Sequence, residues 1–584
     1  MEVLAQEDFA GGMVRDIAPT LIDPRGVYDV RNMVLGEDGS LKRRGGGENI
    51  TSADFGDGLT FAWAGQMSVG QRTVVANSSD FGVLDGTSVV NLGSDGLPRA
   101  VRPAYLAGLL FIPGGYIYAG SKMAANYSTG TVSVTNGSKT VTGSGVTWSS
   151  LVDAGMMLQL GNGRLYVVAS ITDSTHLELR DAYEGSTASG QAYTLRNIYK
   201  ITAADPYEAS DHYCAVQNKL LWADGEKVRF TKDTLSGGPH TYSATEDYDD
   251  LPDGANVVGL AAAGDRALIF STGGLWSLSG IGYDTVSDAG DPQHRLDKLS
   301  EDLVLFGDAG FASWEQMVIA PCTSGVFLLD GISSPIKLSQ NVEPLYTHYT
   351  DGNYRAGGAA VYKGHYLLPI TSGGSTVETL VCRLDRSALD RRRKAGFPWV
   401  RFDQLGGEMR GFTVQVQSDI REPVLIGAGS TGRVVDASYL LNPDSDHVAE
   451  ADGTAHRWSV VTRDFTLDGM TLTRFRYLRL LYEMDEGSIS ADYGDGTRID
   501  GTPLWGHVEW GHFLWSSSEE AEFRNLRRDN LPDSAGPDAG LNPHRWRVGK
   551  RRRRVRFRLR GNDAGLCTLR QLEVLTAPPA TRRR

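Results

Sequence analysis

A repeated unit of short apolar strands separated by glycine turns constrains the fold of this chain more than any other feature. The unit is clearest in two segments, 257–280 (VVGLAAAGDRALIFSTGGLWSLSG) and 316–339 (QMVIAPCTSGVFLLDGISSPIKLS). In each segment one apolar strand leads through a turn into a second strand, and a further turn leads into a third. A sheet of this size has two apolar faces, and neither face is covered until neighbouring sheets stack against it.

Looser copies flank these two segments. In total, seven candidate units begin at residues 67, 104, 214, 257, 316, 359 and 423. Apart from a long gap after residue 120, the starts lie about 37 to 64 residues apart, near the roughly 40 to 50 expected for one propeller blade. Helical periodicity is nearly absent from the chain. We therefore predict an all-β fold built around a β-propeller of about six to seven blades.

The gap after residue 120 holds a segment with a different rhythm, 130–196. Thr, Val and Ser alternate through it, and an Asn136-Gly137 pair predicts a hairpin turn. Three further strands are expected, at 156–160, 164–171 and 176–179. The pattern predicts a small β domain inserted into the repeat. Insertions into repeat proteins lie in loops on one face, which is often the face that contacts partners.

The chain changes character again beyond about residue 440. A stretch rich in Asp, Asn and Pro, 441–456, is typical of a linker, and the strands expected after it predict a separate β-sandwich. The sequence thus predicts four parts: 1–127, an N-terminal arm with the first propeller blades; 128–197, the inserted small β domain; 198–440, the remaining blades; and 441–584, the linker and C-terminal β-sandwich with a basic tail.

Composition places limits on the chemistry of the chain. Hydrophobic residues make up 41% of it, which is enough for packed cores, and the four cysteines lie too far apart for a zinc or disulfide pattern. We expect them to be buried, reduced thiols. The first residues lack the apolar stretch of a secretory signal, and the longest uncharged run, 103–121, is broken by Pro-Gly-Gly. We therefore expect folding in a cytoplasm and no membrane-spanning segment.

Motifs for common catalytic chemistry are missing from the sequence. It has no GxSxG nucleophile turn, no GxxxxGK[ST] phosphate loop and no HExxH zinc motif, and its eleven histidines lie apart. We therefore predict no catalytic residue, no cofactor and no metal site, and we do not expect an enzyme. A carboxylate pair for glycoside cleavage stays open as an alternative, because a propeller brings distant residues together.

Charge is distributed unevenly along the chain. The chain has 58 Lys and Arg against 71 Asp and Glu, a net charge of −13, but residues 543–584 carry 14 bases and two acids. This tail is therefore +12, and the other 542 residues are −25. Within the tail, arginine alternates with apolar residues, so one face of a predicted strand carries four arginines. These are Arg554, Arg556, Arg558 and Arg560.

These four arginines are the candidate site that the sequence offers. Stacked on one strand, they repel one another unless acids lie opposite. We expect them to form an interface with an acidic partner or a neighbouring subunit. Contact with nucleic-acid phosphates and a solvated outer sheet face are the alternatives. Direct base readout is not expected, because no recognition module accompanies the arginines.

The N-terminal residues resemble the opening of a known family. Residues 9–47 are FAGGMVRDIAPTLIDPRGVYDVRNMVLGEDGSLKRRGGG, in which a Gly-Gly-hydrophobe start leads to an Asn, a Gly-Ser-Leu turn and an Arg-x-Gly. This pattern resembles that of the β-propeller tail nozzle (tail hub) proteins of short-tailed bacteriophages. The matching residues are Gly11, Gly12, Asn32, Gly39, Ser40, Leu41, Arg44 and Gly46.

The inserted segment is similar to a module of phage tail proteins with the pattern GS-x-TVTG-x-G-x-x-W. The residues in place are Gly137, Ser138, Thr140, Val141, Gly143, Gly145 and Trp148. The C-terminal sandwich is also similar to those that close such chains.

This resemblance implies a structural virion protein of the phage tail, assembled in the host cytoplasm. Its copies would form a ring, expected to be a homohexamer, below the portal and adaptor rings, and would carry tail fibres or spikes. DNA would pass through the lumen without sequence-specific binding. An acidic lumen fits this role because Asp and Glu repel phosphates, whereas the basic strand fits a subunit or adaptor interface. Replacing Arg556 and Arg558 with Glu is then expected to impair assembly.

Two other hypotheses come from different classes of protein. One is a receptor-binding or polysaccharide-active tail propeller or spike, in which Trp505, Trp510 and Trp515 would stack sugars, although packing in a core is the simpler interpretation. The long β-helical repeats typical of spikes are missing from the sequence, which favours the nozzle. The other hypothesis is a host scaffold propeller, which the neighbouring genes would distinguish.

Overall fold

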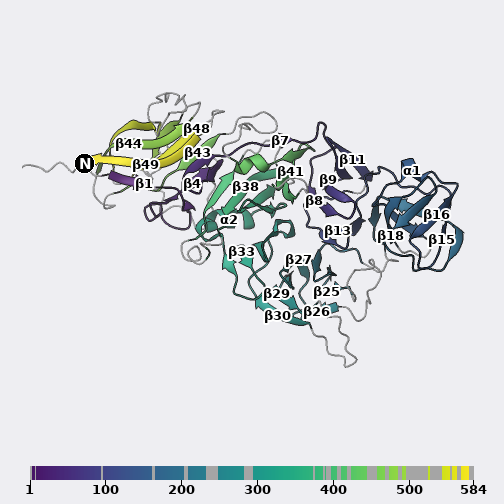
Figure 1. Cartoon of the computed structure of the whole chain (residues 1–584). Coiled ribbons are helices and arrows are strands. Elements are labelled where there is room, and N and C mark those ends of the chain that lie inside the picture. Colours follow the sequence, from purple (N-terminus) through teal and green to yellow (C-terminus); the bar gives the residue numbers. More distant parts are fainter. Residues whose placement is uncertain are drawn as a thin grey trace, which may run out of the picture.

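The computed structural model describes residues 3–6, 8–93, 96–160, 165–202, 208–231, 248–281, 294–372, 375–385, 389, 396–403, 409–416, 422–442, 457–466, 473–484, 489–494, 524–525, 542–552, 555–561 and 567–577. Over these residues the chain is all-β, as predicted, with mostly antiparallel sheets. The short helices are α1 (Trp148–Leu151), α2 (Glu343–Thr350), η1 (Asp308–Gly310), η2 (Gln340–Val342) and η4 (Ser438–Leu441). In Figure 1 the molecule is elongated, with the C-terminal sheets at one end and the strands of 131–196 at the other.

Among the described residues, seven small sheets make up the middle of the molecule. In four of them, four consecutive strands pair in chain order. These are β8 (Phe61–Met67), β9 (Gly70–Ala76), β10 (Phe81–Asp85) and β11 (Ser88–Gly93); β23 (Tyr213–Val216), β24 (Lys219–Asp224), β25 (Lys227–Phe230) and β26 (Tyr248–Asp250); β27 (Val257–Ala263), β28 (Arg266–Ser271), β29 (Gly274–Ser279) and β30 (Arg295–Ser300); and β31 (Ala312–Trp314), β32 (Met317–Cys322), β33 (Gly325–Leu329) and β34 (Ile336–Lys337).

The other three small sheets include strands from elsewhere in the chain or extend beyond four strands. The second sheet along the chain takes its fourth strand from beyond the inserted segment, the sixth continues into a larger sheet, and the seventh takes its fourth strand from the N-terminal arm. Their strands are β12 (Ala104–Leu106), β13 (Leu109–Ile112), β14 (Tyr116–Tyr118) and β22 (Ile198–Lys200); β35 (Arg355–Ala356), β36 (Ala360–Tyr362), β37 (His365–Ser372), β38 (Ser375–Arg383) and β39 (Trp399–Phe402); and β40 (Gly411–Gln415), β41 (Val424–Ala428), β42 (Val434–Asp436) and β7 (Glu48–Asn49).

Each small sheet shares a hydrophobic cluster with the next one along the chain. Between the first two sheets, for example, the rings of Phe81 and Tyr116 lie 4.9 Å apart. The seventh sheet packs back against the first, where the backbone N–H of Ala64 in β8 donates to Oγ1 of Thr413 in β40 at 3.1 Å. Both apolar faces of each sheet are therefore covered, as the repeated pattern requires.

The inserted segment forms one seven-stranded sheet. Its order is β20-β15-β16-β19-β18-β17-β21, and one residue separates β20 from β21, so the two ends of the sheet meet. The strands are β15 (Thr131–Val134), β16 (Thr140–Ser144), β17 (Met157–Leu160), β18 (Leu165–Ile171), β19 (His176–Leu179), β20 (Ala188–Gln191) and β21 (Tyr193–Arg196). A hydrogen bond from Arg180 to the carbonyl of Ala107, at 2.5 Å, and shared apolar contacts fix this sheet to the second small sheet.

Two larger sheets lie at the C-terminal end, and both include strands of the N-terminal arm. The first has the order β47-β44-β49-β6-β5, with β1 also paired to β49; the second continues from β39 through β4, β43, β48, β45 and β46. Their strands are β1 (Val3–Gln6), β4 (Asp29–Arg31), β5 (Met33–Leu35), β6 (Leu41–Arg43), β43 (Trp458–Val461), β44 (Thr473–Met484), β45 (Ser490–Gly494), β46 (Arg524–Asn525), β47 (Asn542–Arg552), β48 (Arg556–Gly561) and β49 (Cys567–Ala577). A short parallel pair, β2 (Gly12–Met13) and β3 (Gly26–Val27), lies between β1 and β4 in the chain.

One hydrophobic core fills the space between these two larger sheets. It combines Phe475, Phe557 and Leu572 of the C-terminal strands with Phe9 and Met33 of the arm. The C-terminal strands therefore do not form their sheets alone, although the sequence predicted a separate sandwich. The arm strands are too short to be recognised by periodicity, since each has only two to four residues.

Two further observations bear on the expectations from composition. All four cysteines are free and buried, as expected, and burial raises the pKa of both Cys214 and Cys567 to about 12. In the part of the chain that the structure describes, no helix is long and apolar enough to span a bilayer.

Candidate functional site

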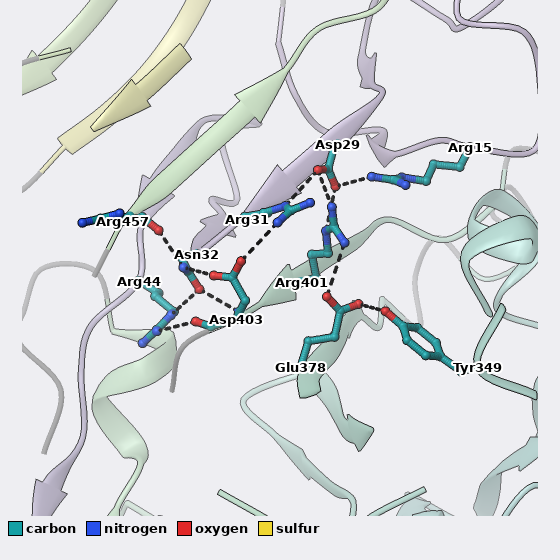
Figure 2. Close-up of polar contacts among 10 residues, drawn as sticks. All are labelled: Arg15, Asp29, Arg31, Asn32, Arg44, Tyr349, Glu378, Arg401, Asp403 and Arg457. Carbon is teal, nitrogen blue, oxygen red and sulfur yellow. Dashed lines mark hydrogen bonds and ion pairs between the residues drawn. The ribbon is translucent and has the colours of Figure 1, made fainter. Parts of the chain in front are cut away.

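The parallel pair of β4 and β39 joins the small sheets to the C-terminal sheets, and a cluster of charged side chains surrounds it. Arg31 of β4 lies opposite Arg401 of β39 in this pair. Figure 2 shows the ten residues of the cluster, which come from the arm, from α2, β38 and β39, and from the residues flanking β39 and β43. We call them the junction cluster: Arg15, Asp29, Arg31, Asn32, Arg44, Tyr349, Glu378, Arg401, Asp403 and Arg457.

Asp29 is the centre of the ionic half of this cluster. Its side chain is buried, and Arg401 donates to both of its oxygens, at 2.9 Å from Nε and 2.6 Å from Nη2. Arg15 and Arg31 approach the same carboxylate at 2.9 and 3.1 Å. Burial alone would raise the pKa of Asp29, but the three guanidinium groups outweigh it and hold that pKa well below its usual range.

Arg401 also connects this carboxylate to a second buried acid. Its Nη1 lies 3.3 Å from Oε2 of Glu378, which accepts a hydrogen bond from the hydroxyl of Tyr349 through its other oxygen. Burial, together with the nearby Glu378 carboxylate, raises the pKa of Tyr349 well above its ordinary value. These acids and arginines therefore connect α2, β38 and β39 with the arm.

Asn32 organises the hydrogen-bonded half of the cluster. Its backbone has φ of 55°, a left-handed conformation that Asn tolerates better than most residues. Its amide donates to a carboxylate oxygen of Asp403 and to the carbonyl of Arg457 at 2.6 Å, and its side-chain oxygen accepts from Nε of Arg44 at 3.0 Å. One buried amide thus holds together the arm, the end of β39 and the start of β43.

Tyr28 extends the junction cluster toward the C-terminal sheets. Two guanidinium groups lie over its ring, Arg15 at 5.1 Å and Arg556 at 4.5 Å from the ring centroid. Arg556 in turn pairs with the buried Asp464 at 2.8 Å. A guanidinium over the face of a tyrosine ring is favourable because the ring faces carry negative electrostatic potential.

The candidate arginines of the basic strand lie next to this arrangement. Arg558 and Arg560 both pair with the buried Asp492, at 3.1 and 2.7 Å, whereas Arg554 lies outside the described residues. The alternation is as the sequence indicated, because Phe557 and Leu559 are buried in the core on the other face. Acids of the same chain do lie opposite the arginines, so the argument from mutual repulsion no longer favours an intermolecular contact for them.

Some of the residues that carry the N-terminal resemblance lie in or next to the junction cluster. Asn32 and Arg44 belong to the cluster itself. Gly12 has φ of +64°, and a Cβ there would lie 2.9 Å from Pro398, directly before β39. The constraint on these positions is therefore steric and electrostatic, and it acts where the arm meets the sheets.

The residues that carry the second resemblance build the core of the inserted sheet. Trp148 is fully buried, and its indole N–H donates to the hydroxyl of Tyr193 at 3.0 Å. A Cβ on Gly143 would lie 2.8 Å from the Trp148 ring, so glycine is needed for this close approach. Val141 is fully buried in the same cluster.

A second group of polar residues lies where several small sheets converge. Asp308, in the connection before β31, pairs with Arg99 at 3.0 Å and with Nδ1 of His212 at 3.1 Å. His212 also borders a cleft of about 410 Å³. The cleft is lined by Gly114, Ala209, Ser210, Asp211, His212, Ala223, Asp224, Gly225 and Val257.

Neither group gathers the ligands of a metal ion. Among the described residues, no three His, Cys, Asp or Glu side chains lie together in a way that could hold one. In the junction cluster the acids are paired with arginines, so its physical effect is to hold parts of the chain in a fixed relation.

Most of the junction cluster was not singled out by sequence reasoning. Asp29 and Arg401 are 372 residues apart, and no periodicity links them. A weak signal does exist: both lie in strands where charged and apolar residues alternate, DVR at 29–31 and VRF at 400–402. Such a pattern normally indicates a solvated strand face, and only the pairing of β4 with β39 shows that these charges are buried.

Comparisons with known proteins add little to this description. No family model and no curated protein match the chain. Among solved structures, the chain is similar to one described as "Kluyveromyces lactis Hsv2 complete loop 6CD", at 7% identity and a TM-score of 0.26, with 70% of this chain and 95% of that chain covered. A TM-score this low carries no argument about fold or function.

Proposed function

We propose that this chain is a structural virion protein of a short-tailed phage. Several copies form a ring-shaped tail nozzle below the portal and adaptor rings, and the genome leaves through the channel of that ring. The proposal starts from the resemblance of the arm and the inserted segment to such proteins. It includes the domain division given above, with the arm added to the C-terminal part.

The observation that carries the proposal is the junction cluster. Two residues of the N-terminal resemblance, Asn32 and Arg44, lie where the arm, the small sheets and the C-terminal sheets meet. A subunit that transmits force along a tail needs its parts held in one orientation. Buried, mutually satisfied ion pairs and hydrogen bonds do this better than a flexible linker, because breaking one leaves a buried charge without its partner.

We also propose that the seven small sheets are the blades of a seven-bladed propeller. It is supported by the contact of each sheet with the next and of β40 with β8. The arm strand β7 would close the ring, because it pairs with β42 of the last sheet from a position ahead of the first. Closure of this kind removes the two open ends that an unclosed row of sheets would leave.

In this proposal the DNA channel lies between copies of the chain. In the centre of the ring of small sheets, residues just before the second sheet contact residues at the start of the fifth. Arg99 pairs there with Asp308 at 3.0 Å, and Arg102 donates to the carbonyl of Phe311 and to the hydroxyl of Ser313. A channel for double-stranded DNA therefore has to lie between several subunits arranged around a common axis.

Native mass spectrometry and negative-stain class averages of the purified protein, alone and with the tail adaptor, test the proposal. We expect a closed ring with a central hole, formed alone or on the adaptor. A chain that stays monomeric under both conditions would overturn the nozzle.

The cleft beside His212 supports a second candidate, a polysaccharide-active or receptor-binding tail propeller. Asp211 and Asp224 both line it, and paired carboxylates are what glycoside cleavage requires. Under this alternative, the protein binds or shortens a host surface polysaccharide, and Asp211→Asn abolishes that effect. A ring on the adaptor, together with no binding of the polysaccharide, would exclude it.

A further inference from the structure

The outer face of the six-stranded C-terminal sheet carries an excess of positive charge. On the interior strand β44, Arg474 and Arg476 are exposed, and Tyr477 beside them is 37% exposed. The alternate residues Phe475 and Leu478 are fully buried in the core. This face therefore points away from the core that joins the two C-terminal sheets.

The neighbouring edge strand β47 is also rich in arginine. In β47, positions Arg551, Arg547 and Arg545 pair directly with Arg474, Tyr477 and Arg479 of β44. We call Arg474, Arg476 and Arg479 of β44 the basic face.

Little negative charge balances the basic face within the described chain. Glu573 of β49 lies opposite Arg479 and pairs with it at 3.1 Å. Arg474 and Arg476 have no acid within ion-pair distance among the described residues. Bases close together on one sheet face repel each other, so an acidic partner outside this face would lower the free energy of the folded chain.

Protection of a sheet edge does not account for this arrangement. Charged residues on an edge strand prevent two sheets from pairing edge to edge, and β47 is such a strand. Arg474 and Arg476 lie on β44, which is paired on both sides by β47 and β49. Their charges lie on the broad face of the sheet. Docking of a partner explains charges in that place more simply than protection of an edge does. Arginine and tyrosine are also enriched in the centres of protein interfaces.

The chain itself carries a complementary surface on other sheets. The described residues of 208–302, which contain the sheets β23–β26 and β27–β30, have 11 acids and six bases. In Figure 1 these sheets lie well away from β44. We call them the acidic sheets; their exposed acids include Asp211, Glu226, Asp250, Asp253, Asp265, Glu301 and Asp302.

We infer that the basic face docks on the acidic sheets of a second copy of this chain. Two different patches on one chain make a head-to-tail contact, and such contacts generate a closed ring when the rotation between copies closes. Opposite charges on the two patches guide encounter and fix the register of the copies. The inference rests on the proposed ring and names the surface that forms it.

Charge reversal on the exposed arginines tests this surface. The variant R474E/R476E is expected to raise the protein concentration at which rings form by roughly tenfold or more, because like charges then face each other. The control R355E/K200E makes the same change in charge at two exposed residues of other sheets and should leave ring formation unchanged. Rings of the unmodified protein should also weaken as salt rises, since exposed charges are screened within about 8 Å at physiological salt.

Cross-linking identifies the partner surface. The variant Arg474→Lys keeps the charge and adds an amine, which a carbodiimide couples to a carboxylate in direct contact. Mixed isotope-labelled and unlabelled subunits distinguish links between copies from links within one. We expect links between copies, from position 474 to an acid within 208–302. Links confined to one chain, or to acids elsewhere, would overturn the inference.

These experiments distinguish a wrong docking surface from a wrong proposal that the chain forms a ring. If unmodified protein forms rings and R474E/R476E forms them equally well, the surface is wrong and the nozzle stands. If R474E/R476E forms rings but loses salt-dependent binding to duplex DNA, the basic face binds phosphates and the inference is overturned. If the unmodified protein forms no ring, with or without the adaptor, both fall together.

Discussion

Arg401 is shared by two buried acids, Asp29 and Glu378, and its loss would leave both of them short of positive charge. We predict that Arg401→Met destabilises the chain by about 3 to 5 kcal/mol, the usual effect of removing one partner from a buried ion pair. Urea denaturation and the melting temperature measure it. Arg355→Met, at an exposed position, is the control and should change the stability by less than about 0.5 kcal/mol. Equal effects of the two substitutions would show that Asp29 and Glu378 do not depend on Arg401.

The lowered pKa of Asp29 makes part of the stability depend on pH. Its folded pKa lies below the unfolded value of about 3.9, so its contribution is present above that pH and is lost as the pH falls through and below it. We predict that Asp29→Asn lowers the melting temperature at pH 7, and that the difference from the unmodified protein narrows below about pH 4. A difference that stays constant from pH 7 to pH 3 would contradict the assignment.

At the scale of single residues, the sequence predicts patterns but not partners. The alternation of arginine and apolar residues in β48 correctly indicates which side chains enter the core. The partners of Arg556 and Arg558 are Asp464 and Asp492, which lie 92 and 66 residues away in the chain. Nothing local distinguishes an arginine that meets such an acid from one that faces solvent, so the pairing had to come from the structure.

At the scale of elements, each of the seven candidate units corresponds to strands of one small sheet. The unit at 257–280 contains β27, β28 and β29, and the unit at 316–339 contains β32, β33 and β34. The strands that were missed are those separated from their hairpins by long connections or contributed from elsewhere, such as β30, β22 and β7. Strands that pair across such distances are held in place by contacts between the small sheets. Their sequences carry no periodic pattern that predicts the pairing.

The inserted sheet depends on Trp148 for its core. Replacing it with Ala removes a fully buried indole and its hydrogen bond to Tyr193. We predict a loss of about 3 to 5 kcal/mol in the stability of this sheet, typical of deleting a buried aromatic ring. Limited proteolysis followed by mass spectrometry should detect cleavage within 131–196 before cleavage in the other sheets.

Trp148→Phe is the matched variant, because it keeps most of the apolar volume and loses the indole N–H. It should be cleaved more slowly than Trp148→Ala. If both variants resist protease as well as the unmodified protein, the module motif does not act through this core.

At the scale of the whole molecule, the arm is the feature that the sequence predicted least well. Its residues resemble the start of a known family, but the four-part division left it with the first blades. In the structure it supplies strands to both C-terminal sheets and one strand, β7, to the seventh small sheet. Strands of two to four residues carry too little periodicity to be assigned, and their partners lie several hundred residues away.

Because the arm pairs with several sheets, we predict that a substitution in the arm destabilises strands that lie far apart in the sequence. Asn32→Ala removes hydrogen bonds to Asp403, Arg44 and Arg457, and alanine does not favour φ of 55°. We predict faster amide hydrogen exchange in both β39 and β43, the two strands that flank β4. The physical reason is that opening of β4 frees hydrogen-bonding groups on each of them.

The pattern of exchange, more than its size, decides whether the arm couples the parts of the chain. The inserted strands β16 and β18 should keep their protection in Asn32→Ala, whereas Trp148→Ala should have the opposite effect and leave β39 and β43 protected. If Asn32→Ala speeds exchange only within the arm, then the small sheets and the C-terminal sheets are held together by their apolar core alone. The junction cluster would then stabilise the arm without fixing the orientation of the sheets that a ring subunit requires.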